Sequence, residues 1–172
     1  MAAVGRRAAR VCRLGSMRVH LCAVGRLRPS PERDLVEEYA ARFDRTGRAL
    51  SLGPFAVHEV EDKKNLGMAA EAELLARAIP QGALLVTLDE RGSQISSPEF
   101  AALLTRWRDD GRQDVAFVIG GADGIDPALR ARADASISFG KMVWPHMLVR
   151  VLLCEQLYRA AAILAGLPYH RA

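Results

Sequence analysis

The chain ends in a helix that is apolar on nearly every face, and this feature constrains the fold more than any other. The helix is expected from about 147 to 165, and only Arg150, Glu155, Gln156 and Arg159 interrupt its apolar character. A surface helix carries one apolar stripe, whereas a helix that is apolar all round has to be covered on several sides. A chain of 172 residues offers little cover for such a helix at its own terminus. We therefore expect a second subunit, in a homodimer, to pack against it.

Ionisable and aromatic residues flank this helix at both ends. The loop before it closes with Trp144, Pro145 and His146, and the chain after it closes with the segment 169–171, Tyr-His-Arg. A flexible, solvated tail is the ordinary expectation for a terminus, but these three residue types are unusual for mere solvation. The pattern indicates a functional site beside a subunit interface.

Strand and helix signals alternate along the rest of the chain, and the strands are mostly continuous apolar runs. Such runs are typical of strands covered on both faces. Alternation of this kind predicts an α/β domain with a mostly parallel sheet flanked by helices. We expect strands at 19–24, 55–60, 83–88, 115–119 and 135–139, helices at about 31–44, 68–78 and 97–110 with a short one after 126, and a loop at 89–94.

The basic character of the chain comes from its first sixteen residues. The net charge is +4, and residues 1–16 contain four arginines and no acid, which leaves 24 − 4 = 20 basic against 20 acidic residues in 17–172. Overall charge therefore gives no argument for nucleic-acid binding. The Arg- and Ala-rich leader has the composition of an organellar transit peptide, but we favour Met17 as the true start. We expect 17–172 to form a single domain.

Several classes of protein are excluded. No run of 18 apolar residues exists, so no membrane span is expected. Cys12, Cys22 and Cys154 are far apart and predict neither a disulfide framework nor a metal site, which favours a reducing cytoplasm. The chain also lacks the spacing of a dinucleotide fingerprint and the Gly-Lys-Ser/Thr of a phosphate-binding loop.

Unusual loops follow three of the expected strands. They begin at Leu88-Asp89, at Gly120-Gly121 and at Phe139. In open α/β sheets, ligands bind beyond the carboxyl ends of the strands, and glycine lets the backbone approach a ligand closely. A tight turn from strand to helix explains the glycines equally well, so the residues alone leave both readings open.

Five blocks of residues resemble one known family. These are Val86-Thr-Leu-Asp-Glu-Arg-Gly92, Phe117-Val-Ile-Gly-Gly-Ala-Asp-Gly124, Pro145-His146, Glu155-Gln-Leu-Tyr-Arg-Ala160 and Tyr169-His-Arg171. Their order and spacing are similar to those of the large-subunit ribosomal-RNA methyltransferase H family, a compact member of the SPOUT class, from Met17 to the C-terminus. Several blocks in register are far more specific than a single motif.

The resemblance implies a C-terminal trefoil knot that holds S-adenosylmethionine and needs no metal. It implies that the cofactor is bound mainly by backbone groups and apolar side chains. Relatives usually have Ser at Gly140 and Thr at Val143, and a lost hydroxyl contact at either position would weaken binding. The implied cofactor-binding residues are Leu88, Gly120, Phe139, Gly140, Lys141, Met142, Val143 and Trp144.

The resemblance also implies methylation at N3 of a pseudouridine in the helix 69 hairpin of large-subunit rRNA, on the assembled ribosome. N3 carries an acidic imide proton, so a histidine near neutral pH is a suitable base. Arginines can hold phosphate or the developing negative charge, and a tyrosine can stack on a base. The candidate catalytic residues are His146, Arg150, Tyr169, His170 and Arg171, with Arg159 a further candidate cation.

Two points stay open at this stage. The residues do not say whether His146, His170 or another group accepts the proton, because His146 at a helix start can also serve only in capping or packing. The Glu155–Arg159 pair has the ordinary i,i+4 spacing of a structural ion pair. The alternative function is a non-catalytic ribosome-binding module that retains the fold, and cofactor affinity discriminates between the two.

Overall fold

The computed structural model describes residues 15–170, so the leader at 1–14 and the last two positions, including Arg171, lie outside the described part. Within it, five strands form one sheet in the order β2-β1-β4-β3-β5, and every neighbouring pair is parallel. This confirms the predicted α/β class. The strands are β1 (Met17–Val24), β2 (Leu52–Val60), β3 (Leu84–Gln94), β4 (Asp114–Ile119) and β5 (Ala135–Ser138).

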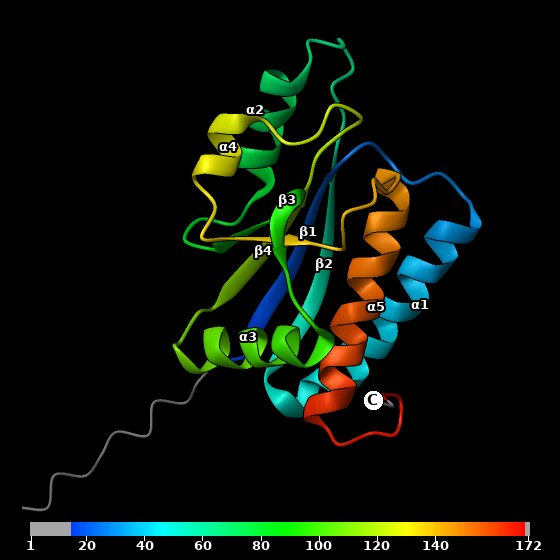
Figure 1. Cartoon of the computed structure of the whole chain (residues 1–172), viewed down its shortest axis with the longest axis vertical. Helices are drawn as coiled ribbons and strands as arrows, with labels where there is room; N and C mark the ends of the chain where they lie inside the picture. Colours follow the sequence, from blue (N-terminus) through cyan, green and yellow to red (C-terminus); the bar gives the residue numbers. More distant parts are fainter. Residues whose placement is uncertain (1–14, 171–172) are drawn as a thin grey trace, which may run out of the picture.

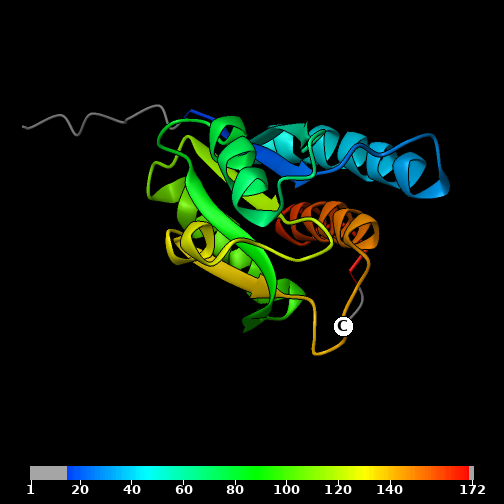
Figure 2. The same cartoon turned by 90° about the horizontal axis from the view of Figure 1, so that it is seen from above.

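Helices cover both faces of this sheet (Figure 1). Figure 2 shows α1 and α5 together on one side and α2 with α4 on the other. α3 lies on the α5 side and contacts it. The helices are α1 (Pro31–Gly47), α2 (Met68–Ala78), α3 (Ser97–Asp109), α4 (Pro127–Ala131) and α5 (His146–Leu164), with a 3-10 turn η1 (Arg48–Leu50) after α1.

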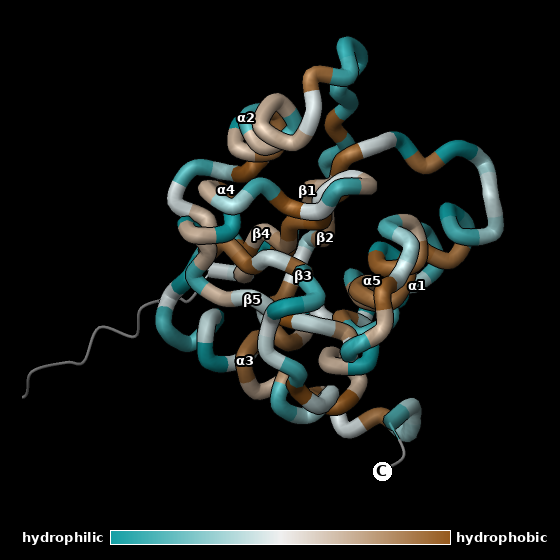
Figure 3. The backbone as a smooth tube through the Cα atoms, turned by 45° about the horizontal axis from the view of Figure 1, so that its top comes forward, coloured by the Kyte–Doolittle hydropathy of each residue, from teal (hydrophilic) through white to brown (hydrophobic). Residues whose placement is uncertain are grey.

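Side chains on the two faces of β1 pack into two separate cores. Val19, Leu21 and Ala23 pack into the larger core beneath α1, α3 and α5, whereas Cys22 and Val24 pack into the smaller one beneath α2 and α4. Side chains alternate between the faces of a strand, so a strand buried on both faces is apolar throughout. Figure 3 shows this hydrophobic interior, with the hydrophilic residues concentrated in the loops and on the outer helix faces.

Local capping signals set the starts of several helices. The Ser30 side chain accepts a hydrogen bond from Arg33 N, with Pro31 opening α1, and Asp126 accepts from Ala128 N at the start of α4. A Ser, Asp or Asn at this position satisfies backbone N–H groups that have no partner inside the helix. These two predicted starts are confirmed. α3 begins at Ser97, where its start was predicted, and is capped by Ser96 in a capping box with Glu99.

α5 receives more cover from its own chain than its sequence suggested. It packs against α1, α3 and the sheet, and its buried residues include Leu153, Cys154 and Leu157. The premise that the chain cannot cover this helix is therefore wrong, because α1 and α3 flank it on the same face of the sheet. Cover is least complete near the start, where Met147 and Leu148 are exposed.

Two other predictions need correction. Residues 89–94 were expected as a loop, but β3 continues to Gln94, with its pairing to β5 shifted so that Leu88 and Ser93 both face Ile137. A polar bulge inside a strand has the composition of a loop, so pattern alone does not distinguish them. Leu35 shares the helical spacing of the apolar residues of α1, yet it is exposed, and Val36 and Phe43 form the buried face.

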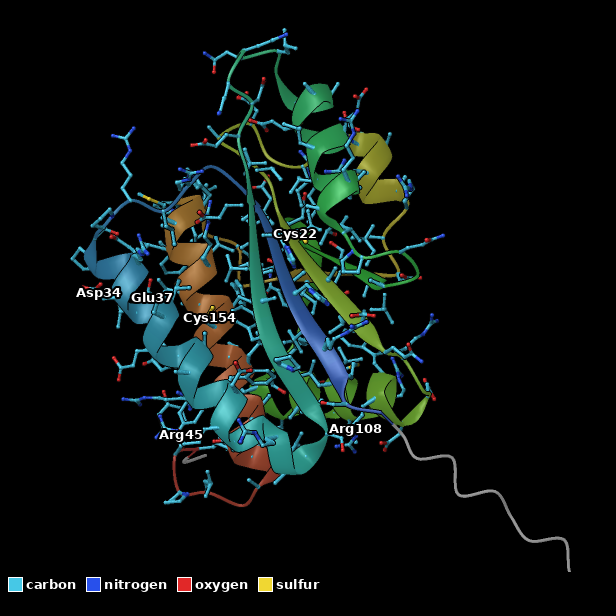
Figure 4. All side chains as sticks on the ribbon, turned by 180° about the vertical axis from the view of Figure 1, so that it is seen from behind. Cys22, Asp34, Glu37, Arg45, Arg108 and Cys154 are labelled. Carbon is cyan, nitrogen blue, oxygen red and sulfur yellow. The ribbon has the colours of Figure 1, made fainter. Side chains whose placement is uncertain are left out.

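The two cysteines of the described part are free and buried. Figure 4 shows Cys22 on β1 and Cys154 on α5, in different layers of the molecule. Burial raises the pKa of each thiol to about 12, so both are packing residues, as predicted for Cys154. Among residues 15–170, no helix combines the length and apolarity that crossing a membrane requires.

Candidate functional site

A cleft of about 440 Å³ opens at the carboxyl edge of the sheet, beside the bulge of β3 and the ends of β4 and β5. Its walls come from this bulge, from the segments after β4 and β5, and from the start of α5. A second hollow of about 340 Å³ adjoins it and shares Leu88 and the segment 137–140. The main cleft includes seven of the eight sequence-predicted cofactor residues, all except Lys141, namely Leu88, Gly120, Phe139, Gly140, Met142, Val143 and Trp144.

The glycine turn after β4 shapes one wall. A Cβ atom at Gly120 would lie 2.3 Å from the carbonyl oxygen of Gly124 and 2.8 Å from Ile125 N. Gly124 itself has a φ of +87° and donates a 3.1 Å hydrogen bond from its N–H to the Gly121 carbonyl. The tight turn itself therefore requires these glycines. The same glycines also expose backbone groups to the cleft, so they serve both the turn and the candidate ligand site.

The segment after β5 forms the opposite wall. The Ser138 hydroxyl donates to the Gly140 carbonyl at 2.9 Å and accepts from the Gly140 N–H at 3.2 Å, which closes a small loop. Gly140 has a φ of +119°, a conformation that L side chains rarely adopt. Serine at this position would therefore be strained in this backbone. Beyond it, Met142 and Val143 are 73% and 80% exposed, so this wall has apolar surface uncovered in the single subunit.

Charged side chains line one end of the cleft. Arg130 Nη1 lies 3.2 Å from Asp89 Oδ2, and Asp89 Oδ1 accepts the N–H of Arg91 at 2.9 Å. Asp123 also lines the cleft, so Asp89 and Asp123 both bound it. Just outside, burial raises the pKa of Glu71, and the neighbouring acids Asp62 and Asp123 add to this effect.

His146 lines the cleft at the first position of α5. Burial, and then the positive charge of Arg150, lower its pKa below the ordinary 6.5. A histidine with a lowered pKa is mostly neutral at pH 7, and neutral imidazole can accept a proton. The geometry therefore suits His146 to the role of a base.

Arg150 lies one helical turn further on and is only 1% exposed. Its Nη1 donates to Glu59 at 3.0 Å, and its Nη2 donates to the carbonyls of Val24 and Gly25 at 2.6 and 2.8 Å. The guanidinium thus ties α5 to the ends of β1 and β2, and it does not line the cleft. In this subunit it acts on His146 through its charge.

The C-terminal tail lies at the other end of α5 (Figure 1). Tyr169 packs on Tyr158 with ring centroids 4.6 Å apart, its hydroxyl donates to Glu155 at 2.9 Å, and Arg159 lies over its ring at 4.8 Å. Glu155 also accepts two hydrogen bonds from Arg159, so that pair is structural, as favoured. His170 Nδ1 is buried without a hydrogen-bond partner among the described residues.

The tail and the cleft of one chain are therefore not brought together. Tyr169 contacts Glu155 and Tyr158, which lie nine and twelve residues along α5 from His146; at 1.5 Å per residue this is about 14–18 Å. Tyr169 and His170 stay predicted site residues. Arg130 and Ile125, which line the cleft, were missed by the sequence analysis. The only available signal for Arg130 was its place after a strand-to-helix turn.

Two histidines outside the cleft form a structural cluster. His20 Nε2 lies 2.8 Å from Asp114, His20 Nδ1 lies 3.0 Å from His58 Nε2, and Arg18 donates two hydrogen bonds of 2.7 Å to Asp114. These contacts link β1, β2 and β4, so both histidines have a structural role. In residues 15–170, no group of three or more His, Cys, Asp or Glu side chains is arranged to hold a metal ion.

Known proteins resemble this chain over nearly its whole length. Residues 17–170 match the family model described as "Predicted SPOUT methyltransferase". Two proteins named "Ribosomal RNA large subunit methyltransferase H", from Ruegeria sp. strain TM1040 and Ruegeria pomeroyi, are 71% and 72% identical to it over 155 residues, which is 90% of this chain and 99% of each relative.

A solved structure of a probable methylase family protein from Haemophilus influenzae Rd KW20 shares the fold. It superposes with a TM-score of 0.50 at 13% identity and covers 92% of this chain and 72% of that chain. At this identity the likeness concerns the fold alone. The sequence matches carry the assignment: the chain belongs to the ribosomal RNA large subunit methyltransferase H family of SPOUT methyltransferases.

Proposed function

We propose that this protein is an S-adenosylmethionine-dependent methyltransferase of large-subunit ribosomal RNA. The observation that carries the proposal is the cleft at the carboxyl edge of β3, β4 and β5, in a chain 71% identical to a protein named as such a methyltransferase. In open α/β sheets this edge is the place where ligands bind. The family model matches residues 17–170, a range that includes all three segments that build the cleft.

The residues of the cleft fit S-adenosylmethionine. The volume of about 440 Å³ lies within the range of small-molecule sites. Leu88, Met142 and Trp144 offer apolar walls for a purine ring, and the bare backbone at Gly120 offers groups that can bind the edge of that ring. Charged side chains at one end suit the charged amino-acid part. S-adenosylmethionine supplies an electrophilic methyl group on a sulfonium centre.

The chain's own residues must then position the RNA base and accept its proton. N3 of a pseudouridine carries an imide proton, and we propose His146 as its acceptor. Its pKa is lowered by burial and by Arg150, so it is neutral at pH 7. A base positioned in this way contributes about 10²–10⁴-fold to a rate. Holding the methyl group and the nucleophile at near-attack distance supplies the rest of the acceleration.

The proposed target is N3 of a pseudouridine in helix 69, on the assembled ribosome, and the proposed location is therefore the cytoplasm. This part rests on the resemblance to the family, as does the proposed trefoil knot in the C-terminal half. A nearly neutral domain is compatible with such a substrate. Its recognition would depend on a composite surface of RNA and protein rather than on bulk positive charge.

We propose that the active form is a homodimer whose tails act in trans. A contiguous set of large apolar side chains is exposed beside the cleft and at the start of α5. Such a patch on a small soluble domain marks an interaction site. Tyr169 is held against Glu155 and Tyr158, about 14–18 Å along α5 from His146 in the cleft of its own chain, so we expect a partner's tail to complete the site. The patch comprises Met142, Val143, Trp144, Met147 and Leu148.

The test uses the full chain, methyl-labelled S-adenosylmethionine, and ribosomes from cells that lack this gene. Label in the helix 69 region of large-subunit rRNA is the expected result. Ala122 lines the cleft and is exposed, so Ala122→Trp should block cofactor binding measured by calorimetry without disturbing the core. Ala128→Trp, on the exposed surface of α4, is the matched control and should bind normally.

Each outcome has a separate meaning. Cofactor binding without labelling of rRNA would place the activity on another RNA. Absence of both would favour the non-catalytic ribosome-binding module. Repeating the assay with a protein that starts at Met17 shows whether the leader is needed.

A further inference from the structure

The Asp89–Arg130 ion pair is the least exposed part of the charged end of the cleft, because Glu90, Arg91 and Asp123 are all more exposed. Its two groups come from different loops, 41 residues apart, and meet at 3.2 Å. The Arg130 side chain is 27% exposed and that of Asp89 9%, so a ligand in the cleft can reach the guanidinium. Neither group is needed to hold the other in place. Asp126 and the buried Leu129 anchor α4, and Arg91 N–H holds the other oxygen of Asp89.

The charged side chains that line the cleft together favour a cationic ligand. Three carboxylates line it, from Asp89, Glu90 and Asp123, against two guanidinium groups, from Arg91 and Arg130. The formal sum is 2 − 3 = −1, with His146 neutral because its pKa is lowered. S-adenosylmethionine carries a sulfonium, an ammonium and a carboxylate, which makes a net charge of +1. The demethylated product has lost the sulfonium charge and is neutral overall.

We propose that Arg130 and Asp89 form the subsite for the amino-acid end of S-adenosylmethionine, with Arg130 binding the carboxylate and Asp89 the ammonium group. This inference rests on the proposed function. A ligand that carries both charges can enter between two paired groups and leave neither one without a partner. An unpaired charge would be costly at this partly buried position. In the free protein the two groups therefore pair with each other, and the pairing keeps both side chains in the cleft.

The geometry of arginine suits this role. A guanidinium binds a carboxylate through two parallel N–H donors, and such bidentate pairs are the strongest charge-assisted hydrogen bonds in proteins. Arg130 contacts Asp89 through Nη1 alone in the hydrogen bonds of this structure. Its other donors are therefore available to a ligand carboxylate in the cleft.

The test compares two ligands by calorimetry on the full chain. One is S-adenosylmethionine, and the other is its decarboxylated form, which keeps the sulfonium and the ammonium but lacks the carboxylate. The wild type should bind the first about 10- to 100-fold more tightly, the value of one charge-assisted hydrogen-bonded pair. Arg130→Met should remove this preference and leave the affinity for the decarboxylated ligand within about threefold of the wild-type value.

Two further variants make the assignment specific. Arg132→Met changes an exposed arginine at the end of α4 that does not line the cleft, and it should keep the full preference. Asp89→Asn should lower the affinity for both ligands by a similar factor, because both carry the ammonium group. The affinity for methylthioadenosine, which has no amino-acid part, should stay the same in Asp89→Asn.

Contradictory results are distinguishable from failure of the proposed function. If no adenosyl ligand binds the wild type, the proposed function itself fails. If S-adenosylmethionine binds and Arg130→Met keeps the preference for the carboxylate, the subsite assignment is overturned. Loss of the preference in Arg91→Met instead would move the carboxylate site to Arg91, which also lines the cleft.

Discussion

Replacing Gly120 with alanine should abolish cofactor binding while leaving the core folded. The added Cβ would lie 2.3 Å from Gly124 O, 2.4 Å from Gly124 C and 2.8 Å from Ile125 N. An ordinary van der Waals contact of a carbon atom is about 3.5–4.0 Å, so the backbone of the turn has to move by roughly 1 Å. Overpacking of this kind costs about 1–3 kcal/mol, which a folded domain of this size can tolerate.

The displacement affects the wall that we propose binds the cofactor. We therefore expect the affinity for S-adenosylmethionine to fall by at least about 100-fold, beyond the effect of losing a single hydrogen bond. Calorimetry measures the affinity, and urea denaturation measures the free energy of unfolding.

The matched control for Gly120→Ala is Gly82→Ala, in a turn away from the cleft. Gly82 has a φ of +78° and open space around its Cβ position. Alanine at positive φ costs about 1–2 kcal/mol, so the two variants should lose similar stability. Only Gly120→Ala should lose cofactor affinity. Wild-type affinity in Gly120→Ala, or an equal loss in both variants, would refute the argument.

Three further predictions concern the dimer, the tail and the base. Leu148→Glu places a charge on an exposed side chain that the fold of the single subunit does not need. Light scattering should therefore show a folded monomer, and this monomer should be inactive. An active dimer would contradict the proposed interface. Deleting 169–172 should leave cofactor affinity and dimerisation unchanged but reduce methylation more than about 100-fold. Full activity would exclude a role of the tail in methylation. The lowered pKa of His146 means that this imidazole takes up a proton at lower pH than an ordinary histidine. Methylation by the wild type should therefore fall at acid pH with a midpoint below 6.5. His146→Gln should be slow and lack this fall, and an unchanged acid limb in the variant would exclude His146 as the base.

The same shift of His146 has a consequence for stability. Its folded-state pKa lies below the unfolded value of 6.5, so the unfolded chain binds a proton more readily. The stability contributed by the neutral form is present above pH 6.5 and is lost as the pH falls from there towards the folded-state pKa.

Most secondary-structure elements were predictable from the chain because their signals are local. Ser30-Pro31 and Asp126-Pro127 mark helix starts through hydrogen bonds to residues within one turn. The apolar run before Leu88 marks a strand for a similar reason, since burial on both faces requires apolar residues at every position. The predictions failed at 89–94, where a polar bulge resembles a loop, and at Leu35, where helical periodicity admitted more than one buried face.

The chain alone therefore determined the α/β class, the loops that follow β4 and β5 and, through blocks in register, the family. The tertiary structure decided which side chains meet. Arg150 is separated by 91 residues from Glu59, and Arg130 by 41 from Asp89, so neither pair has a local signal. The order of strands in the sheet brings such groups together, and that order depends on the packing of the whole chain. For the same reason, only the structure showed that α1 and α3 cover α5 and that each tail lies far from the cleft of its own subunit.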